Sequence, residues 1–199
     1  GKSTIARLIA SLWDVKDGSI ELGGVDIRTL PLAECTKRIA YVSQDNYLFD
    51  LSVMDNIRMG KKGASDEEVI AAAKKCGCHE FIMGLENGYK TEMYEGGSQL
   101  SGGQRQLVSF ARTLISDPKI LILDEATSSI DAKTEKELQK GLQELLKGRT
   151  SFIIAHRLST IKNCDKIMFI SNKGITEAGT HDELMAKKGD YYKLCMAQK

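Results

Sequence analysis

The chain opens with Gly1-Lys2-Ser3-Thr4, and a helical pattern follows directly. These residues match the second half of the phosphate-binding loop G-x-x-x-x-G-K-[ST], in which backbone amides and the lysine hold phosphates and the hydroxyl binds Mg²⁺. The first half of that loop would precede Gly1. The short match alone leaves two alternatives, an accidental resemblance or a chain that begins inside its own nucleotide site.

Two carboxylates follow an apolar run in KILILDEATSSID. Asp124 and Glu125 stand at the carboxyl end of an expected buried strand, which is where open α/β sheets bind ligands. Acidic groups are costly to bury unpaired, and a bound cation such as Mg²⁺ would compensate them. The alternative is an Asp-Glu pair that only caps the next turn.

A glycine-rich segment, YEGGSQLSGGQRQLVSFARTLISDP, precedes those carboxylates. Ser101 followed by Gly102 and Gly103 predicts the start of a helix that ends at Asp117-Pro118. Open amides at a helix start, with the positive end of the dipole behind them, form an anion site. The alternative is a glycine-rich cap without a ligand. The expected apolar face consists of Leu107, Phe110, Ala111, Leu114 and Ile115.

The elements that must position these residues alternate between apolar runs and helix-length segments. RIAYVSQ, KILILDE, TSFIIAH and KIMFIS are typical of strands buried on both faces of a parallel sheet, which predicts an α/β fold. Residues 51–117 are too long for one crossover helix and predict an inserted α-helical subdomain. The core would then comprise residues 1–50 and 118–199.

Local patterns predict further elements. Ile5, Leu8, Ile9 and Leu12 have the spacing of one amphipathic helix face. SIEL, two glycines and VDI predict a small antiparallel hairpin. Capping boxes begin at Ser65 and Thr180, the second before one helix, ELMAKKGDYYKLCMAQ. These charged caps are expected to carry no chemistry.

Composition excludes several classes of protein. The 199 residues are 42% hydrophobic with a net charge of +1, so the chain is globular and has no overall field for nucleic acid or anionic lipid. No apolar run approaches the roughly 20 residues of a membrane span. Five scattered cysteines indicate a reducing, cytosolic setting, and the Cys76-Gly77-Cys78-His79 group favours ordinary thiols over zinc.

The motifs gain weight from their order, which is GKST, VSQD, LSGGQRQ, ILILDEATSSID and IIAHR. In this order they resemble the nucleotide-binding domain of ATP-binding cassette (ABC) transporters, over essentially the whole chain. TSSID and AHRLSTI are most similar to the exporter branch, which moves drugs, lipids or peptides. The resemblance implies a P-loop NTPase core, with ATP and Mg²⁺ as ligands.

The resemblance also implies roles for the phosphate loop. Lys2 would contact the β- and γ-phosphates, and Gly1 would let the backbone approach them. The Ser3 hydroxyl would bind Mg²⁺, and Thr4 would lie near the α-phosphate.

Four further residues would complete the catalytic set. Gln44 would reach Mg²⁺ and the attacking water, and Asp124 would hold Mg²⁺. Glu125 would polarise or deprotonate the water, and His156 would hydrogen-bond the γ-phosphate in the transition state.

The signature residues Ser101, Gly102, Gly103 and Gln104 act in this family on the nucleotide of a facing domain, and Asp131 would lie along that junction. Hydrolysis would therefore require a second ABC ATPase domain, identical or different.

Membrane domains are the other implied partner, either fused upstream or separate, which would place the chain at the cytoplasmic face of the cell membrane. In the family, the segment that contains Tyr47, Leu48 and Phe49 receives a coupling helix, although these side chains could equally form core of the helical lobe. The missing first half of the phosphate loop leads us to expect a truncated chain with weak or no ATP binding.

Two other functions remain open at this point. One is a soluble ABC-type ATPase that acts on nucleic acid or in translation, although no heptads or basic stripe favour it, and we expect no nucleic-acid partner. The other is a docking module that does not hydrolyse ATP.

Overall fold

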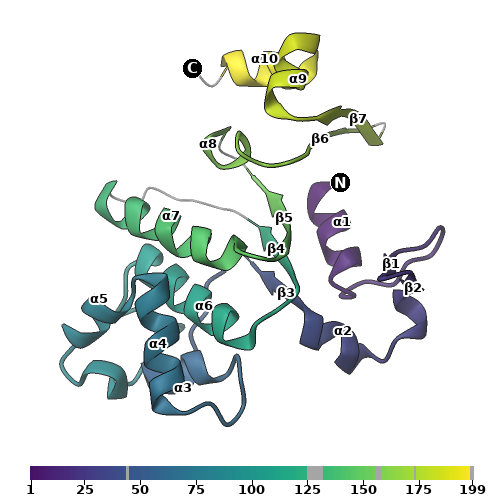
Figure 1. The fold of residues 1–199 in the computed structure, drawn as a ribbon. Coiled ribbons are helices and arrows are strands. Elements are labelled where there is room, and N and C mark those ends of the chain that lie inside the picture. Colours follow the sequence, from purple (N-terminus) through teal and green to yellow (C-terminus); the bar gives the residue numbers. More distant parts are fainter. Residues whose placement is uncertain (44, 125–131, 156–157, 173, 198–199) are drawn as a thin grey trace.

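A three-stranded parallel sheet lies at the centre of the computed structural model, which describes residues 1–43, 45–124, 132–155, 158–172 and 174–197 (Figure 1). Its strands are β3 (Ile39–Val42), β4 (Ile120–Asp124) and β5 (Thr150–Ile154), in the order β3-β4-β5. The middle strand is buried at Leu121, Ile122 and Leu123. The parallel sheet is thus confirmed for three of the four apolar runs.

The fourth run, β6 (Ile167–Ser171), does not join this sheet. It pairs antiparallel with β7 (Gly174–Gly179) in a separate two-stranded sheet, with Ile167 opposite Gly179. The prediction of a fourth parallel strand is wrong, because β6 pairs along one edge with β7, the next strand in the chain, and not with a strand of the parallel sheet. A short apolar run predicts that a strand forms, but it does not predict which strand it pairs with.

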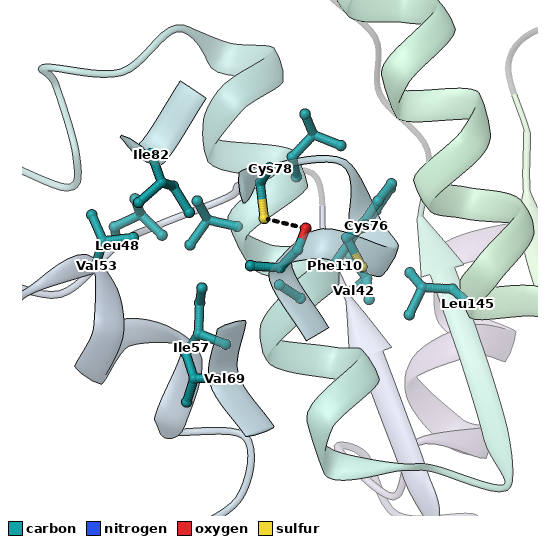
Figure 2. Packing of buried hydrophobic residues seen from close by; sticks show 14 of the residues in the cluster. Val42, Leu48, Val53, Ile57, Val69, Cys76, Cys78, Ile82, Phe110 and Leu145 are labelled. Carbon is teal, nitrogen blue, oxygen red and sulfur yellow. Dashed lines mark hydrogen bonds between the residues drawn. The ribbon is translucent and has the colours of Figure 1, made fainter. Parts of the chain in front are cut away.

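Helices fill the long interval between β3 and β4. They are α3 (Val53–Arg58), α4 (Asp66–Cys76), α5 (His79–Met83), the 3₁₀ turn η2 (Gly88–Lys90) and α6 (Gly102–Ser116). Together with α7 (Ala132–Leu146) they bury a large apolar cluster, part of which Figure 2 shows. Val42 of β3 and Leu123 of β4 belong to the same cluster, so the helices and the sheet share one continuous core.

Two free cysteines of this lobe are part of its buried core. Cys76 and Cys78 are fully buried, and the Cys78 thiol donates to the Ala73 carbonyl over 3.4 Å (Figure 2). Burial raises the pKa of Cys76 to about 12 and also raises that of Cys78, which disfavours the thiolate that a metal needs. Within the described ranges no three His, Cys, Asp or Glu side chains are grouped as a metal site.

The N-terminal part comprises α1 (Lys2–Ile9), β1 (Glu21–Leu22), β2 (Val25–Asp26), η1 (Ile27–Thr29) and α2 (Leu32–Arg38). The predicted hairpin is confirmed, with φ of 59° and 81° at Gly23 and Gly24. The predicted face of α1 is wrong in part. Ile5 is 39% exposed, whereas Ala6 is buried in one cluster with Ile122. Leu12 is 59% exposed because α1 ends at Ile9, before the predicted face is complete.

The predicted capping boxes at Ser65 and Thr180 are formed. A third capping box forms at Ser101, where the sequence predicted the start of a helix. The last segment is two helices instead of one, α9 (His181–Lys187) and α10 (Asp190–Ala197), since Lys188 has φ of 53° and ends the first. A short α8 (Leu158–Ile161) precedes β6. None of the helices that the structure describes is long and apolar enough to cross a bilayer.

Gly60 allows α3 to approach α6 closely, and this contact generates a prediction. A Cβ at Gly60 would overlap the Arg112 carbonyl oxygen and lie 2.7 Å from Ile115 Cγ2. We expect Gly60→Ala to lower the free energy of unfolding by about 1–3 kcal/mol, the usual cost of overpacking. Urea denaturation of the purified protein measures this change.

Gly84→Ala is the matched control. Its backbone is right-handed, and the added Cβ would meet the nearest atom at 3.4 Å, which is ordinary contact. Equal unfolding free energies for the two alanine variants would contradict the close approach.

Candidate functional site

The first turn of α1 presents unpaired donors. Gly1 is its N-cap and makes no side-chain cap, whereas α3, α4, α6 and α9 are each capped by a serine or threonine hydroxyl. The amides of Lys2, Ser3 and Thr4 are therefore left open by helix geometry, and all three residues are exposed. The turn contains no acidic residue. This combination fits a bound anion such as phosphate.

Asp124 lies at the carboxyl end of the central strand. Its Oδ2 accepts a hydrogen bond of 3.2 Å from the Tyr41 hydroxyl on β3. Burial, and next the charge of Asp124, raise the pKa of Tyr41, while Arg7 of α1 opposes the shift. Tyr41 thus stays a neutral donor, and Arg7 and Asp124 both lie near its hydroxyl. The structure in this way links α1 to the end of β4.

The residues present fit Mg²⁺. Among the described residues, no lysine or arginine forms a salt bridge with Asp124, so its half-buried carboxylate is open to a cation. The Ser3 hydroxyl is a second hard oxygen ligand of the kind that Mg²⁺ prefers. Mg²⁺ is commonly held by one or two protein ligands, with phosphates and water completing the shell, so a denser acidic cluster is not required.

The N-terminus of α6 is capped and yet open. Ser101 Oγ accepts from the Gln104 amide at 3.2 Å, and Gln104 Oε1 accepts from the Ser101 amide at 3.0 Å. The Ser101 amide is therefore occupied, but its hydroxyl hydrogen is free to donate. Ser101 and Gly102 are exposed, and the amides of Gly102 and Gly103 have no partner within the helix. Gln104 supports Ser101 in this arrangement.

Four of the expected site residues, Gln44, Glu125, Asp131 and His156, lie outside the described residues. Their neighbours are described. The Ser43 hydroxyl donates to the Asp45 carbonyl over 3.2 Å, and Asp124 immediately precedes Glu125.

The segment after Gln44 divides between surface and core. Tyr47 is 55% and Phe49 42% exposed, with their rings edge to face at 5.5 Å, whereas Leu48 is fully buried. Of the two alternatives for this segment, Leu48 fulfils the core role, and Tyr47 and Phe49 form an apolar surface. No motif identified Tyr41 or Arg112, which contact Asp124 and this segment respectively.

Proteins of known sequence match this chain over its whole length. The chain is 50% identical over 198 residues to the uncharacterized ABC transporter ATP-binding protein YknV of Bacillus subtilis (strain 168), covering 100% of this chain and 33% of that protein. It is 46% identical over 198 residues to the ATP-dependent lipid A-core flippase of Syntrophus aciditrophicus (strain SB), with the same coverage. The chain thus spans about a third of the length of these relatives.

A solved structure and a family model agree with them. The structure of a bacterial Atm1-family ABC exporter with ATP bound is 40% identical, with a TM-score of 0.92 over 100% of this chain and 35% of that one. The sequence model of the family described as "ABC transporter" matches residues 1–128. The chain belongs to the ABC transporter family.

Proposed function

We propose that the chain is the nucleotide-binding domain of an ABC exporter, and that in the full-length protein this domain binds and hydrolyses ATP as part of a dimer. The observation that carries the proposal is the uncapped, acid-free N-terminus of α1, linked through Arg7 and Tyr41 to Asp124 at the end of β4. An ATP-bound exporter of 40% identity supports it.

The triphosphate would lie against the first turn of α1. The amides of Lys2, Ser3 and Thr4 point along the positive end of the helix dipole, which favours an anion there. The Lys2 ammonium would contact the β- and γ-phosphates, Thr4 would lie near the α-phosphate, and Gly1 would leave room for the backbone to approach.

Ser3, Asp124 and Gln44 would hold Mg²⁺. When bound, the ion would offset the charge on the phosphates and polarise them for attack. The hydrogen bond from Tyr41 fixes the orientation of the Asp124 carboxylate, so this ligand is positioned before the ion arrives.

Glu125 would act as the general base. It directly follows Asp124 in the sequence and would therefore lie near the bound Mg²⁺. Gln44 would orient the attacking water, and His156 would donate to the γ-phosphate as negative charge develops there.

A second domain would complete each site. The exposed Ser101 hydroxyl and the open amides of Gly102 and Gly103 would contact the γ-phosphate bound to the facing domain, and Asp131 would lie along the junction. Because these contacts require the γ-phosphate, ATP would favour a closed dimer and hydrolysis would release it. Gln104 would act by holding Ser101 in place.

Export is the proposed use of this cycle. Relatives named as a lipid A-core flippase and as the multidrug resistance protein pgp-1 of Caenorhabditis elegans are 46% and 48% identical. Membrane domains would dock on the apolar surface of Tyr47 and Phe49 and would bind the transported compound. The chain would then work at the cytoplasmic face of the membrane.

Glu125→Gln tests the chemistry in the full-length protein. Loss of a general base is expected to slow hydrolysis about 10²- to 10⁴-fold while ATP binding persists, so that a closed, ATP-loaded dimer accumulates. Phosphate release and retained nucleotide measure the two effects. Glu144→Gln on α7, where the carboxylate pairs with Lys147 at the surface, is the matched control. Wild-type turnover in Glu125→Gln would refute the assignment.

Ser101→Asp separates capping from phosphate contact. Aspartate and asparagine both cap helices as well as serine does, so Ser101→Asp and Ser101→Asn should unfold within about 0.5 kcal/mol of wild type. Aspartate would also place a negative charge against the γ-phosphate. We expect Ser101→Asp to hydrolyse ATP about 10²-fold or more slowly, and Ser101→Asn to lose much less. If both variants hydrolysed ATP at the wild-type rate, Ser101 would serve only as a cap, and equal losses would show that the negative charge of aspartate does not meet the γ-phosphate.

A further inference from the structure

Asn56 is a fully buried polar residue on α3 with no role so far. Its Nδ2 donates to the carbonyls of Phe49, Leu51 and Ser52 over 3.0, 3.2 and 3.1 Å, and its Oδ1 accepts from the Phe49 amide at 2.9 Å. One side chain thus bonds to four backbone groups of the turn 49–52. The shape of the segment 47–52 depends on this amide.

Arg112 reaches the same segment from α6. Its Nε donates to the backbone carbonyl of Asn56 at 2.9 Å, and its Nη2 donates to the side-chain Oδ1 of Asn56 at 3.0 Å. Its Nη1 donates to the backbone carbonyl of Tyr47 at 3.4 Å. The guanidinium lies 5.5 Å from the centre of the Phe49 ring. Asn56 and Arg112, here called the 56–112 clamp, therefore tie the segment 47–52 to α6.

The 56–112 clamp consists of directed hydrogen bonds to neutral oxygens and contains no ion pair among the described residues. Burial lowers the pKa of Arg112, yet among the described residues no carboxylate pairs with it. Its ligands are neutral oxygens in fixed directions, which the planar guanidinium contacts at three separate nitrogens. Lysine could not reproduce this pattern.

The segment 47–52 is also connected to Ser101 by a second set of contacts, through the segment 91–97. Three backbone hydrogen bonds join the segments 48–53 and 91–96. The Leu48 amide donates to the Gly96 carbonyl over 3.3 Å, and the Met93 amide donates to the Leu51 carbonyl over 2.9 Å. The Val53 amide donates to the Thr91 carbonyl over 3.0 Å. The segment 91–97 leads directly to Ser101, and α6 runs from Ser101 back to Arg112 over about 16 Å at 1.5 Å per residue. The segment 47–52 and the start of α6 are thus held at two points.

We propose that Asn56 and Arg112 are positioning residues that make the segment 47–52 and Ser101 move as one body. The inference rests on the proposed function, in which Tyr47 and Phe49 contact the membrane domain and Ser101 contacts ATP on the facing domain. A displacement of the segment would then move Ser101 toward or away from the γ-phosphate.

Arg112→Lys in the full-length protein tests the proposal. We expect kcat for ATP to fall about tenfold, since small misplacement of a transition-state contact is costly, with KM for ATP within about twofold because α1 is untouched. Arg112→Gln, which keeps a planar donor without the charge, is a second variant and should also lower kcat.

Arg149→Lys is the matched control. Arg149 also donates to backbone carbonyls, at 2.9 Å to Pro118 and 3.0 Å to Leu145. It also pairs with Asp117 at 2.9 Å, and in the part of the chain that the structure describes its partners all belong to the scaffold around β4 and α7. Arg149→Lys should lower the free energy of unfolding about as much as Arg112→Lys does, and should keep the wild-type kcat. Equal kcat values for Arg112→Lys and Arg149→Lys, per folded molecule, would reduce the clamp to a stabilising contact.

The decisive measurement repeats Arg112→Lys in a Ser101→Ala background. If the clamp acts through Ser101, the second substitution changes kcat less than about twofold there. A full, independent tenfold loss would overturn the proposal. The same assays separate a failure of this proposal from a failure of the proposed function. If the proposed function were wrong, the wild type would not hydrolyse ATP, or Glu125→Gln would not reduce its hydrolysis.

Discussion

Helix α6 must satisfy two opposing demands, and much of the structure follows from them. Leu107, Phe110 and Ala111 have to be buried among the helices and against the sheet, which fixes the helix along its length. At its first turn Ser101 and Gly102 have to remain exposed, and the amides of Gly102 and Gly103 have no partner within the helix. The capping box of Ser101 and Gln104 meets both demands, since it stabilises the helix start without covering it. The close approach at Gly60 and the hydrogen bonds of Arg112 then set where that start lies.

Features encoded by neighbouring residues could be predicted from the sequence. The caps at Ser65 and Thr180 and the hairpin at Gly23-Gly24 depend on contacts within a few residues, and all are formed. The failures depend on distant partners. The strand 167–171 was expected in the parallel sheet, but its apolar run does not specify its neighbour. Likewise, the periodicity of α1 favours Ile5, whereas the space beside the sheet takes Ala6.

The candidate site divides in the same way. Motifs identify Lys2, Asp124 and Ser101, because phosphate and metal chemistry requires particular residue types at short spacing. Tyr41, Asn56 and Arg112 belong to no such motif, and their partners are remote in sequence. A weak signal exists for Asn56, a polar residue between the buried positions 53 and 57 of a short helix, because a buried amide must be hydrogen-bonded. The sequence does not specify which groups it contacts.

The near-neutral chain also explains why the proposed site needs two helix ends. With a net charge of +1, no overall field attracts a nucleotide, so binding depends on local dipoles and Lys2. Each helix N-terminus behaves as roughly half a positive charge. In the proposed dimer, α1 of one domain would face α6 of the other, and these like partial charges would repel one another across an empty junction. A γ-phosphate between them would replace the repulsion with two attractions, and its release after hydrolysis would remove the attraction to α6 of the facing domain. Two helix starts of the same sign can therefore close on a triphosphate and separate after its hydrolysis.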